Sequence, residues 1–224
     1  MYSAIRMAAP AFAALVFSCA ILTAQNASAE MQFSIYGGVQ GATDSTVDLS
    51  DGSSFDAGWE GKSFSSPPYY GGRVTWWLTD FNHPNLGFSL DYTHAKVYAD
   101  DATLNRSGWS HFEFTDGLNL VTANALYRFQ QDGRRWTPYV GAGVGVNIPH
   151  VEVTRASGTT FDYEVGGVTL QAQAGISFKI SEHWSAFTEY KGNYSFVDVP
   201  IDSGDYLKTK IFTNAVNVGL SFHW

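Results

Sequence analysis

The last stretch of the chain, residues 212–224, reads FTNAVNVGLSFHW, and its pattern decides the fold. In an extended strand, every second residue from Phe212 to Trp224 lies on one face, and all of these except Asn214 are apolar or aromatic. The residues between them, from Thr213 to His223, are small or polar. Alternation with a period of two is typical of a β-strand that has one apolar and one polar face. The stretch therefore predicts a strand between two different environments.

Seven further segments alternate in the same way, with lengths close to the roughly 9–11 residues that a tilted strand needs to cross a bilayer. Together with the last stretch they occupy residues 32–41, 70–78, 85–93, 118–129, 138–148, 168–180, 184–194 and 212–224. Segment 138–148 shows the pattern clearly, because Val140, Val144 and Val146 share one face and glycines lie on the other. Small residues on an inner face suit a narrow lumen.

The connections between these segments alternate in length. Long ones occupy about residues 42–69, 94–117, 149–167 and 195–211, and short ones 79–84, 130–137 and 181–183. In outer-membrane barrels the short turns face the periplasm and the long loops face outside. The final strand resembles the assembly signal of outer-membrane proteins, so we expect the outer-membrane assembly machinery to bind the strand that ends in Trp224. The sequence predicts an all-β fold, an eight-stranded antiparallel transmembrane β-barrel with four long extracellular loops in a Gram-negative outer membrane.

The first 29 residues have the features of a secretory signal peptide. Arg6 precedes an apolar stretch over residues 7–22, and Ala27, Ser28 and Ala29 form the small-residue pattern that signal peptidase cleaves. We therefore expect a signal peptide at residues 1–29 and a single barrel domain at residues 30–224. The only cysteine, Cys19, lies in the leader, so the rest of the chain has no thiol for a disulfide or a metal.

A soluble, lipocalin-like barrel is the alternative fold, because alternation alone does not say which face meets lipid. Aromatic residues near the segment ends, where interfacial girdles belong, favour the membrane barrel. The polar faces would then fill the lumen with Arg73, Asp91, Asn124, Arg128, Gln171, Gln173, Lys179, Glu189 and Lys191. Charges in a narrow barrel are costly unless they are paired, so we expect an ion-pair network there.

The net charge of −8 is concentrated in the long loops. These loops carry 15 Asp and Glu but only six Lys and Arg, whereas the barrel segments and short turns are balanced. The shortage of cations argues against a nucleic-acid partner, since phosphate binding needs clustered Lys and Arg. Acidic loops beside anionic lipopolysaccharide would repel it unless divalent cations bridge the two, so the pattern indicates either cation binding or loop solubility.

Three side chains are predicted to meet just above the outer rim of the barrel. Side-chain parity along segments 85–93, 118–129 and 138–148, extended past the membrane edge, directs His94, Glu113 and His150 to the lipid-facing side. Two histidines and a carboxylate form a transition-metal site with open positions. Lys96 lies on the same side as a possible contact for a phosphate or carboxylate. The alternative is that these residues only order the loops.

Longer motifs across residues 59–217 resemble one family, the outer-membrane lipid A oxidases of α-proteobacteria. The motifs are WEGK (59–62), PPYY (67–70), TWW (75–77), YTHAKVYAD (92–100), EFTDGLN (113–119), PHV (149–151) and TNAVN (213–217). The resemblance implies O₂-dependent oxidation of the proximal glucosamine of 1-dephosphorylated lipid A to 2-aminogluconate, with hydrogen peroxide as the by-product. Triplet oxygen reacts slowly with such a sugar, so a redox metal at the predicted triad would be chemically useful.

The motif positions add further site residues. We expect Lys62 to contact an anion, Trp59 to contact substrate, and Asp100 or Asp116 to act as a base. The sequence has no Gly-rich nucleotide loop, haem-attachment motif or G-x-S-x-G elbow, so no organic cofactor is expected. Two other functions stay open, namely a small OmpA-like structural or adhesive barrel and a barrel enzyme that modifies the acyl chains of lipid A.

Overall fold

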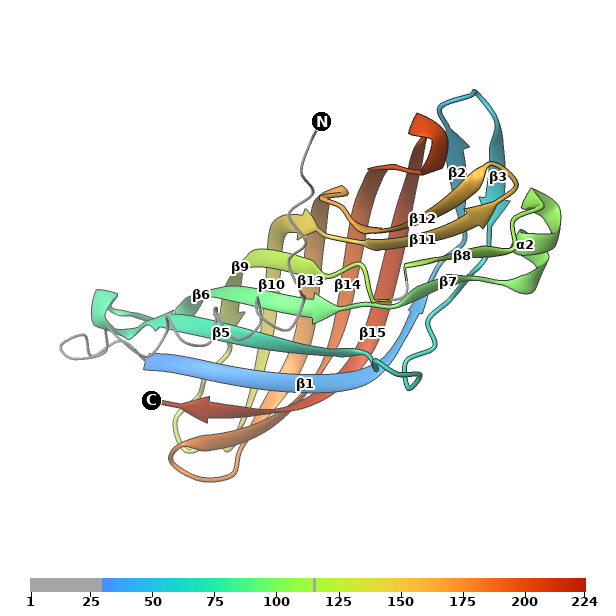
Figure 1. The fold of residues 1–224 in the computed structure, drawn as a ribbon. Helices are drawn as coiled ribbons and strands as arrows, with labels where there is room; N and C mark the ends of the chain where they lie inside the picture. Colours follow the sequence, from blue (N-terminus) through green and yellow to red (C-terminus); the bar gives the residue numbers. More distant parts are fainter. Residues whose placement is uncertain (1–29, 115) are drawn as a thin grey trace.

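Eight long strands form a closed antiparallel barrel in the computed structural model, which describes residues 30–114 and 116–224 (Figure 1). They are β1 (Glu30–Ala42), β5 (Tyr70–Leu78), β6 (His83–His94), β9 (Leu120–Arg128), β10 (Trp136–Asn147), β13 (Gly167–Lys179), β14 (Trp184–Pro200) and β15 (Tyr206–His223). Each pairs with the next in this series, and β1 pairs with β15 to close the barrel. All eight predicted strands are confirmed, whereas the predicted signal peptide at residues 1–29 lies outside the described residues.

The barrel wall is apolar outside and polar inside. On β15, Val216, Val218 and Leu220 are exposed on the outer surface, whereas Asn217 and Ser221 are buried on the inner one. A soluble lipocalin-like barrel needs apolar side chains inside. That alternative is therefore wrong, and the outer surface has the apolar character of a wall in contact with lipid.

Ion pairs fill the lumen, as the sequence predicted. Arg73 contacts Asp91 at 2.8 Å and Glu189 at 2.6 Å, and Lys191 contacts Asp91 at 2.8 Å. All four side chains are almost completely buried, so each charge depends on its partners. Lys179 differs from the prediction, because it is exposed at the end of β13 rather than buried in the lumen.

The long connections contain short strands where the sequence suggested loops. Five of these strands form a second sheet in the order β12-β11-β8-β7-β4, composed of β4 (Trp59–Glu60), β7 (Val97–Ala99), β8 (His111–Phe114), β11 (His150–Arg155) and β12 (Gly158–Tyr163). We call it the extracellular sheet. Two more strands, β2 (Ser45–Leu49) and β3 (Ser54–Ala57), extend the barrel sheet beside β15.

The remaining elements are short helices: η1 (Thr79–Phe81), α2 (Asp101–Ser107) and η2 (Asp202–Gly204). None of the helices in residues 30–114 and 116–224 is long and apolar enough to cross a membrane.

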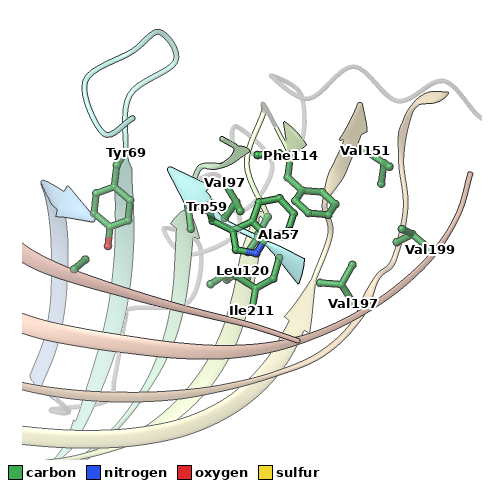
Figure 2. Close-up of a cluster of buried hydrophobic side chains, with 14 of the residues drawn as sticks. Ala57, Trp59, Tyr69, Val97, Phe114, Leu120, Val151, Val197, Val199 and Ile211 are labelled. Carbon is green, nitrogen blue, oxygen red and sulfur yellow. The ribbon is translucent and has the colours of Figure 1, made fainter. Parts of the chain in front are cut away.

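A hydrophobic core lies between the extracellular sheet and the outer ends of β14 and β15 (Figure 2). Val97, Phe114 and Val151 come from the extracellular sheet, and Val197 and Ile211 come from the barrel strands opposite. Aromatic rings fill the space between them; the ring of Trp59, for example, lies 5.0 Å from that of Phe112. The two sheets thus form a sandwich that closes the outer mouth of the barrel.

The outer edge of the apolar belt can be located on β14 and β15. The last two outward residues of β14 below the edge, Tyr194 and Phe196, are aromatic, and the next one is Asp198, which forms an exposed ion pair of 2.8 Å with Lys208. Inward residues change in the opposite sense at the same place, from the polar Ser195 to the apolar Val197. The belt therefore ends between residues 196 and 198, and the sandwich begins there.

Candidate functional site

The extracellular sheet has one face in the hydrophobic core and one face that is polar. Register places five residues in a row across the polar face, each opposite the next: Glu60, Tyr98, Glu113, Glu152 and Phe161. Their sequence neighbours, such as Phe112 and Val151, point the other way into the core. We call this polar side, with the side chains that flank the row, the outer face.

Two His-x-Glu sequences lie side by side on this face. His111-Phe112-Glu113 belongs to β8 and His150-Val151-Glu152 belongs to the antiparallel β11, with Glu113 directly opposite Glu152. The Nε2 atom of His111 lies 3.1 Å from Oε1 of Glu113 and 3.4 Å from Oε2 of Glu152. Among the described residues, these three side chains bring ligand atoms within 4.8 Å of one another.

His150 completes the cluster from the second strand. Its side chain is 3% exposed, with its ring stacked on Tyr163 at 4.4 Å and edge-on to Phe161 at 4.4 Å. Its Nδ1 atom lies 3.1 Å from Oε1 of Glu152 and 3.5 Å from Oδ2 of Asp116, but is buried without an aligned hydrogen bond. Glu152 therefore lies between two histidines, with one carboxylate oxygen near each.

Two lysines and a tyrosine lie on the β7 side of the cluster. The ammonium of Lys62 is 4.6 Å from the centre of the Tyr98 ring and 3.3 Å from Glu60, and it is partly exposed. Lys96 is fully buried and donates a 3.0 Å hydrogen bond to the carbonyl of Ser65. Lys62 is thus placed to meet an anion from solvent, whereas Lys96 lies beneath the surface.

Burial and charge shift the pKa values on this face in consistent directions. Desolvation lowers the pKa of Lys96, and the carboxylates of Glu113 and Asp116 oppose that shift. Burial raises the pKa of Tyr98 to about 12, and the charges of Glu113 and Glu152 contribute in the same direction. Burial and the Asp116 carboxylate raise the pKa of Tyr163 to about 12. The same carboxylates therefore act on Lys96, Tyr98 and Tyr163.

His94 lies beside the cluster without joining the ligand group. Its ring stacks on Tyr70 at 5.1 Å, and its Nδ1 atom is 3.0 Å from the carbonyl oxygen of Pro68. Gly117 packs closely against the same ring, since a Cβ there would lie only 3.0 Å from Cδ2 of His94. The predicted set of His94, Glu113 and His150 is therefore not assembled as metal ligands within the described part of the chain. His94 therefore contacts two connections at the rim, through Pro68 in one and Gly117 in the other.

Two other predicted site residues have structural positions. Trp59 is buried in the core, where its indole N–H donates to Ser45 Oγ at 2.8 Å, so it does not lie on the outer face. Asp100 caps the N-terminus of α2 by accepting a 2.7 Å hydrogen bond from the backbone N–H of Thr103. Hydrogen bonds from the side chain and the backbone of Thr103 lower the pKa of the Asp100 carboxyl.

Asp116, predicted as a possible base, lies close to the cluster. Its Oδ2 accepts a 3.1 Å hydrogen bond from the hydroxyl of Tyr163 and faces His150. His111 and Glu152 were not among the site residues predicted from the sequence. The repeated His-x-Glu pattern was the available signal, because residues two apart share one face of a strand.

The outer face continues the lipid-facing wall of the barrel. Tyr92 points outward on β6 and donates a 2.7 Å hydrogen bond to Asn119 next to Asp116. The ring of Tyr70 contacts both the wall and the site: its centre lies 6.1 Å from that of Tyr92, and it stacks on the ring of His94. The cluster therefore lies directly above the apolar belt, on its outer side.

Sequence comparison decides the family. A family model described as an outer membrane protein beta-barrel domain matches residues 12–223. The chain belongs to this family. The protein is therefore located in the bacterial outer membrane.

Solved structures of small barrels are similar in fold. Neisserial surface protein A has 16% identity, with 88% of this chain and 97% of that chain covered and a TM-score of 0.48. OprG from Pseudomonas aeruginosa has 12% identity, with 89% and 97% covered and a TM-score of 0.46. No curated protein sequence matches the chain.

Proposed function

We propose that this barrel is an outer-membrane enzyme that oxidises the proximal glucosamine of 1-dephosphorylated lipid A to 2-aminogluconate with O₂. The observation that supports it is the position of the outer face, where His111, Glu113, His150 and Glu152 gather directly above the apolar belt. A lipid A molecule in the outer leaflet has its acyl chains beside such a belt and its sugars just above. The sugar would therefore meet this cluster without leaving the membrane.

The proposed reaction balances in two steps. The anomeric C1–H and O–H of the free hemiacetal lose two electrons and two protons, which gives a lactone, and O₂ takes them up as hydrogen peroxide. Water then opens the lactone to the acid. The product is heavier than the substrate by one oxygen atom, which is why mass spectrometry can report the reaction.

The described side chains suit the binding and proton-transfer parts of this reaction. Lys62 is partly exposed and can contact a phosphate or carboxylate of the lipid. Asp116 is partly exposed and lies 3.5 Å from His150, so it can accept a proton at the edge of the cluster. Amino-acid side chains of these types do not themselves take up two electrons, so the electron transfer to O₂ requires a further group.

Lipid A mass spectrometry tests the proposal. Deletion of the gene should remove a species 16 Da heavier than its precursor, and expression of the wild-type chain should restore it. Glu113→Gln should restore little of this species, because it removes a carboxylate from the centre of the cluster. His83→Ala is the matched control, since His83 is exposed at the opposite end of β6, and it should restore the full amount.

The same measurement separates the two other functions. If lipid A gained or lost acyl chains instead of 16 Da, the protein would be an enzyme that modifies acyl chains and not an oxidase. A lipid A profile that is identical with and without the gene would contradict any lipid A enzyme and would leave a structural or adhesive barrel.

A further inference from the structure

The facing glutamates on the outer face are an electrostatic anomaly. Glu113 and Glu152 are direct cross-strand partners of β8 and β11, and both side chains are largely buried, with 14% and 16% exposed. Like charges directly opposite each other destabilise an antiparallel pair. A positive charge beside both carboxylates, either on a protonated His111 or on a bound cation, would reduce this cost.

His150 gives an independent indication of what that charge is. It is buried at 2% exposure, and its Nδ1 atom points toward Glu152 and Asp116 without an aligned hydrogen bond. Buried polar atoms normally make an aligned hydrogen bond, and a metal ion shared with the neighbouring carboxylate of Glu152 would satisfy this nitrogen. The neighbouring rings of Phe161 and Tyr163 fix the orientation of the imidazole.

We propose that His111, Glu113 and Glu152, with His150 as a fourth ligand, bind one divalent transition-metal ion on the outer face. Nitrogen and carboxylate ligands lie about 2.0–2.2 Å from such an ion, so two ligand atoms on opposite sides are about 4 Å apart. The ligand atoms of His111, Glu113 and Glu152 already lie within 4.8 Å of one another, so small rotations of these three side chains would surround an ion. His150 lies outside this group, with its Nδ1 atom 3.1 Å from Glu152, and has to move closer to act as the fourth ligand. Imidazole ligands favour a transition metal over Mg²⁺ or Ca²⁺, which prefer all-oxygen sites.

A metal at this site would lie beside the outer leaflet, where the proposed oxidation takes place. Its use in catalysis rests on the proposed function. Metal binding itself does not depend on that function. Lys62 and Glu60 form their own ion pair on the other side of Tyr98, so the ligand group is distinct from the anion contact.

Cobalt titration of the purified full-length barrel in detergent tests the inference. After EDTA treatment and removal of the chelator, we expect calorimetry and visible absorption to report one Co²⁺ bound per chain, with Mg²⁺ unable to displace it. His111→Ala and Glu152→Gln should weaken binding about tenfold or more. Glu60→Gln is the matched control, since Glu60 lies in the same row two strands away, and it should bind Co²⁺ like the wild type.

Thermal unfolding of Glu113→Gln guards against a variant that merely fails to fold. In EDTA its Tm should equal or exceed that of the wild type, because the facing charges are reduced. Added Co²⁺ should raise the wild-type Tm but not that of the variant. If the wild-type Tm does not respond, or if His111→Ala and Glu152→Gln bind Co²⁺ as well as the wild type, the metal site is wrong. Co²⁺ binding without any lipid A oxidation would instead refute only the proposed function.

Discussion

The two halves of this barrel have opposite polarity. In the membrane half, Arg73, Asp91 and Lys191 lie inside and apolar residues such as Val218 lie outside. In the extracellular half, apolar rings such as that of Phe112 lie inside, and the charged cluster lies outside. The same strands, β14 and β15, run through both halves. Each face of a strand therefore matches the surroundings at its own level, which are lipid below the rim and water above it.

Removing a lumen charge should have the largest effect. Arg73→Met leaves the buried carboxylates of Asp91 and Glu189 without the cation that contacts both most closely, and should cost about 5 kcal/mol of unfolding free energy. Urea unfolding in lipid vesicles measures this. Lys208→Met breaks an exposed ion pair of the extracellular half and should cost no more than about 1 kcal/mol. Equal costs would contradict the assignment of the lumen as the dry, ion-paired interior.

Truncating a ring in the extracellular core should come next. Phe112 is 2% exposed, so Phe112→Ala should cost about 4 kcal/mol through lost burial and a cavity. We expect this cost to appear as loosening of the sandwich, measured by proteolysis of the intact protein. Phe161→Ala is the control, because Phe161 is 64% exposed and its loss should change little. Proteolysis that is the same for both variants would argue against a packed extracellular core.

A charge on the lipid-facing wall should have a smaller effect. Val218 is exposed at the membrane level of β15, so Val218→Arg should cost about 3 kcal/mol in a bilayer. Thr46→Arg, on the exposed side of β2 in the extracellular half, should cost less than about 0.5 kcal/mol. Measuring the unfolding free energies of both variants in vesicles tests this difference. Similar costs would mean that the edge of the apolar belt has been assigned to the wrong level of the barrel.

The helix cap should have the smallest effect. Asp100→Ala should cost about 1 kcal/mol, because α2 loses its N-terminal acceptor. The pKa of Asp100 is lowered, so its stabilisation is present above the ordinary value of 3.8 and disappears as the pH falls through the lowered value. Unfolding of the variant and the wild type should therefore converge at acid pH. Asp101→Ala removes no cap hydrogen bond, so the difference in stability between this variant and the wild type should change less with pH.

The sequence predicted the membrane half well, because there lipid outside and charge inside produce strict alternation along each strand. It did not predict the extracellular strands, since alternation with the apolar side inward looks the same as alternation with the apolar side outward. Parity placed Glu113 and His150 on one side of the rim, but it could not show that His94 stacks on its cross-strand partner Tyr70 and approaches the carbonyl of Pro68. His111 and Glu152 were missed because their partnership depends on the β8–β11 register.

The proposed function requires contact between the outer face and lipopolysaccharide, and site-specific photocrosslinking in intact cells measures that contact. A photoreactive residue in place of Phe161, on the outer face beside His150, should crosslink to lipopolysaccharide. The same residue in place of Phe55, which packs against Trp109 on the core side, should not. Crosslinking to lipopolysaccharide at both positions, or at neither, would contradict the account.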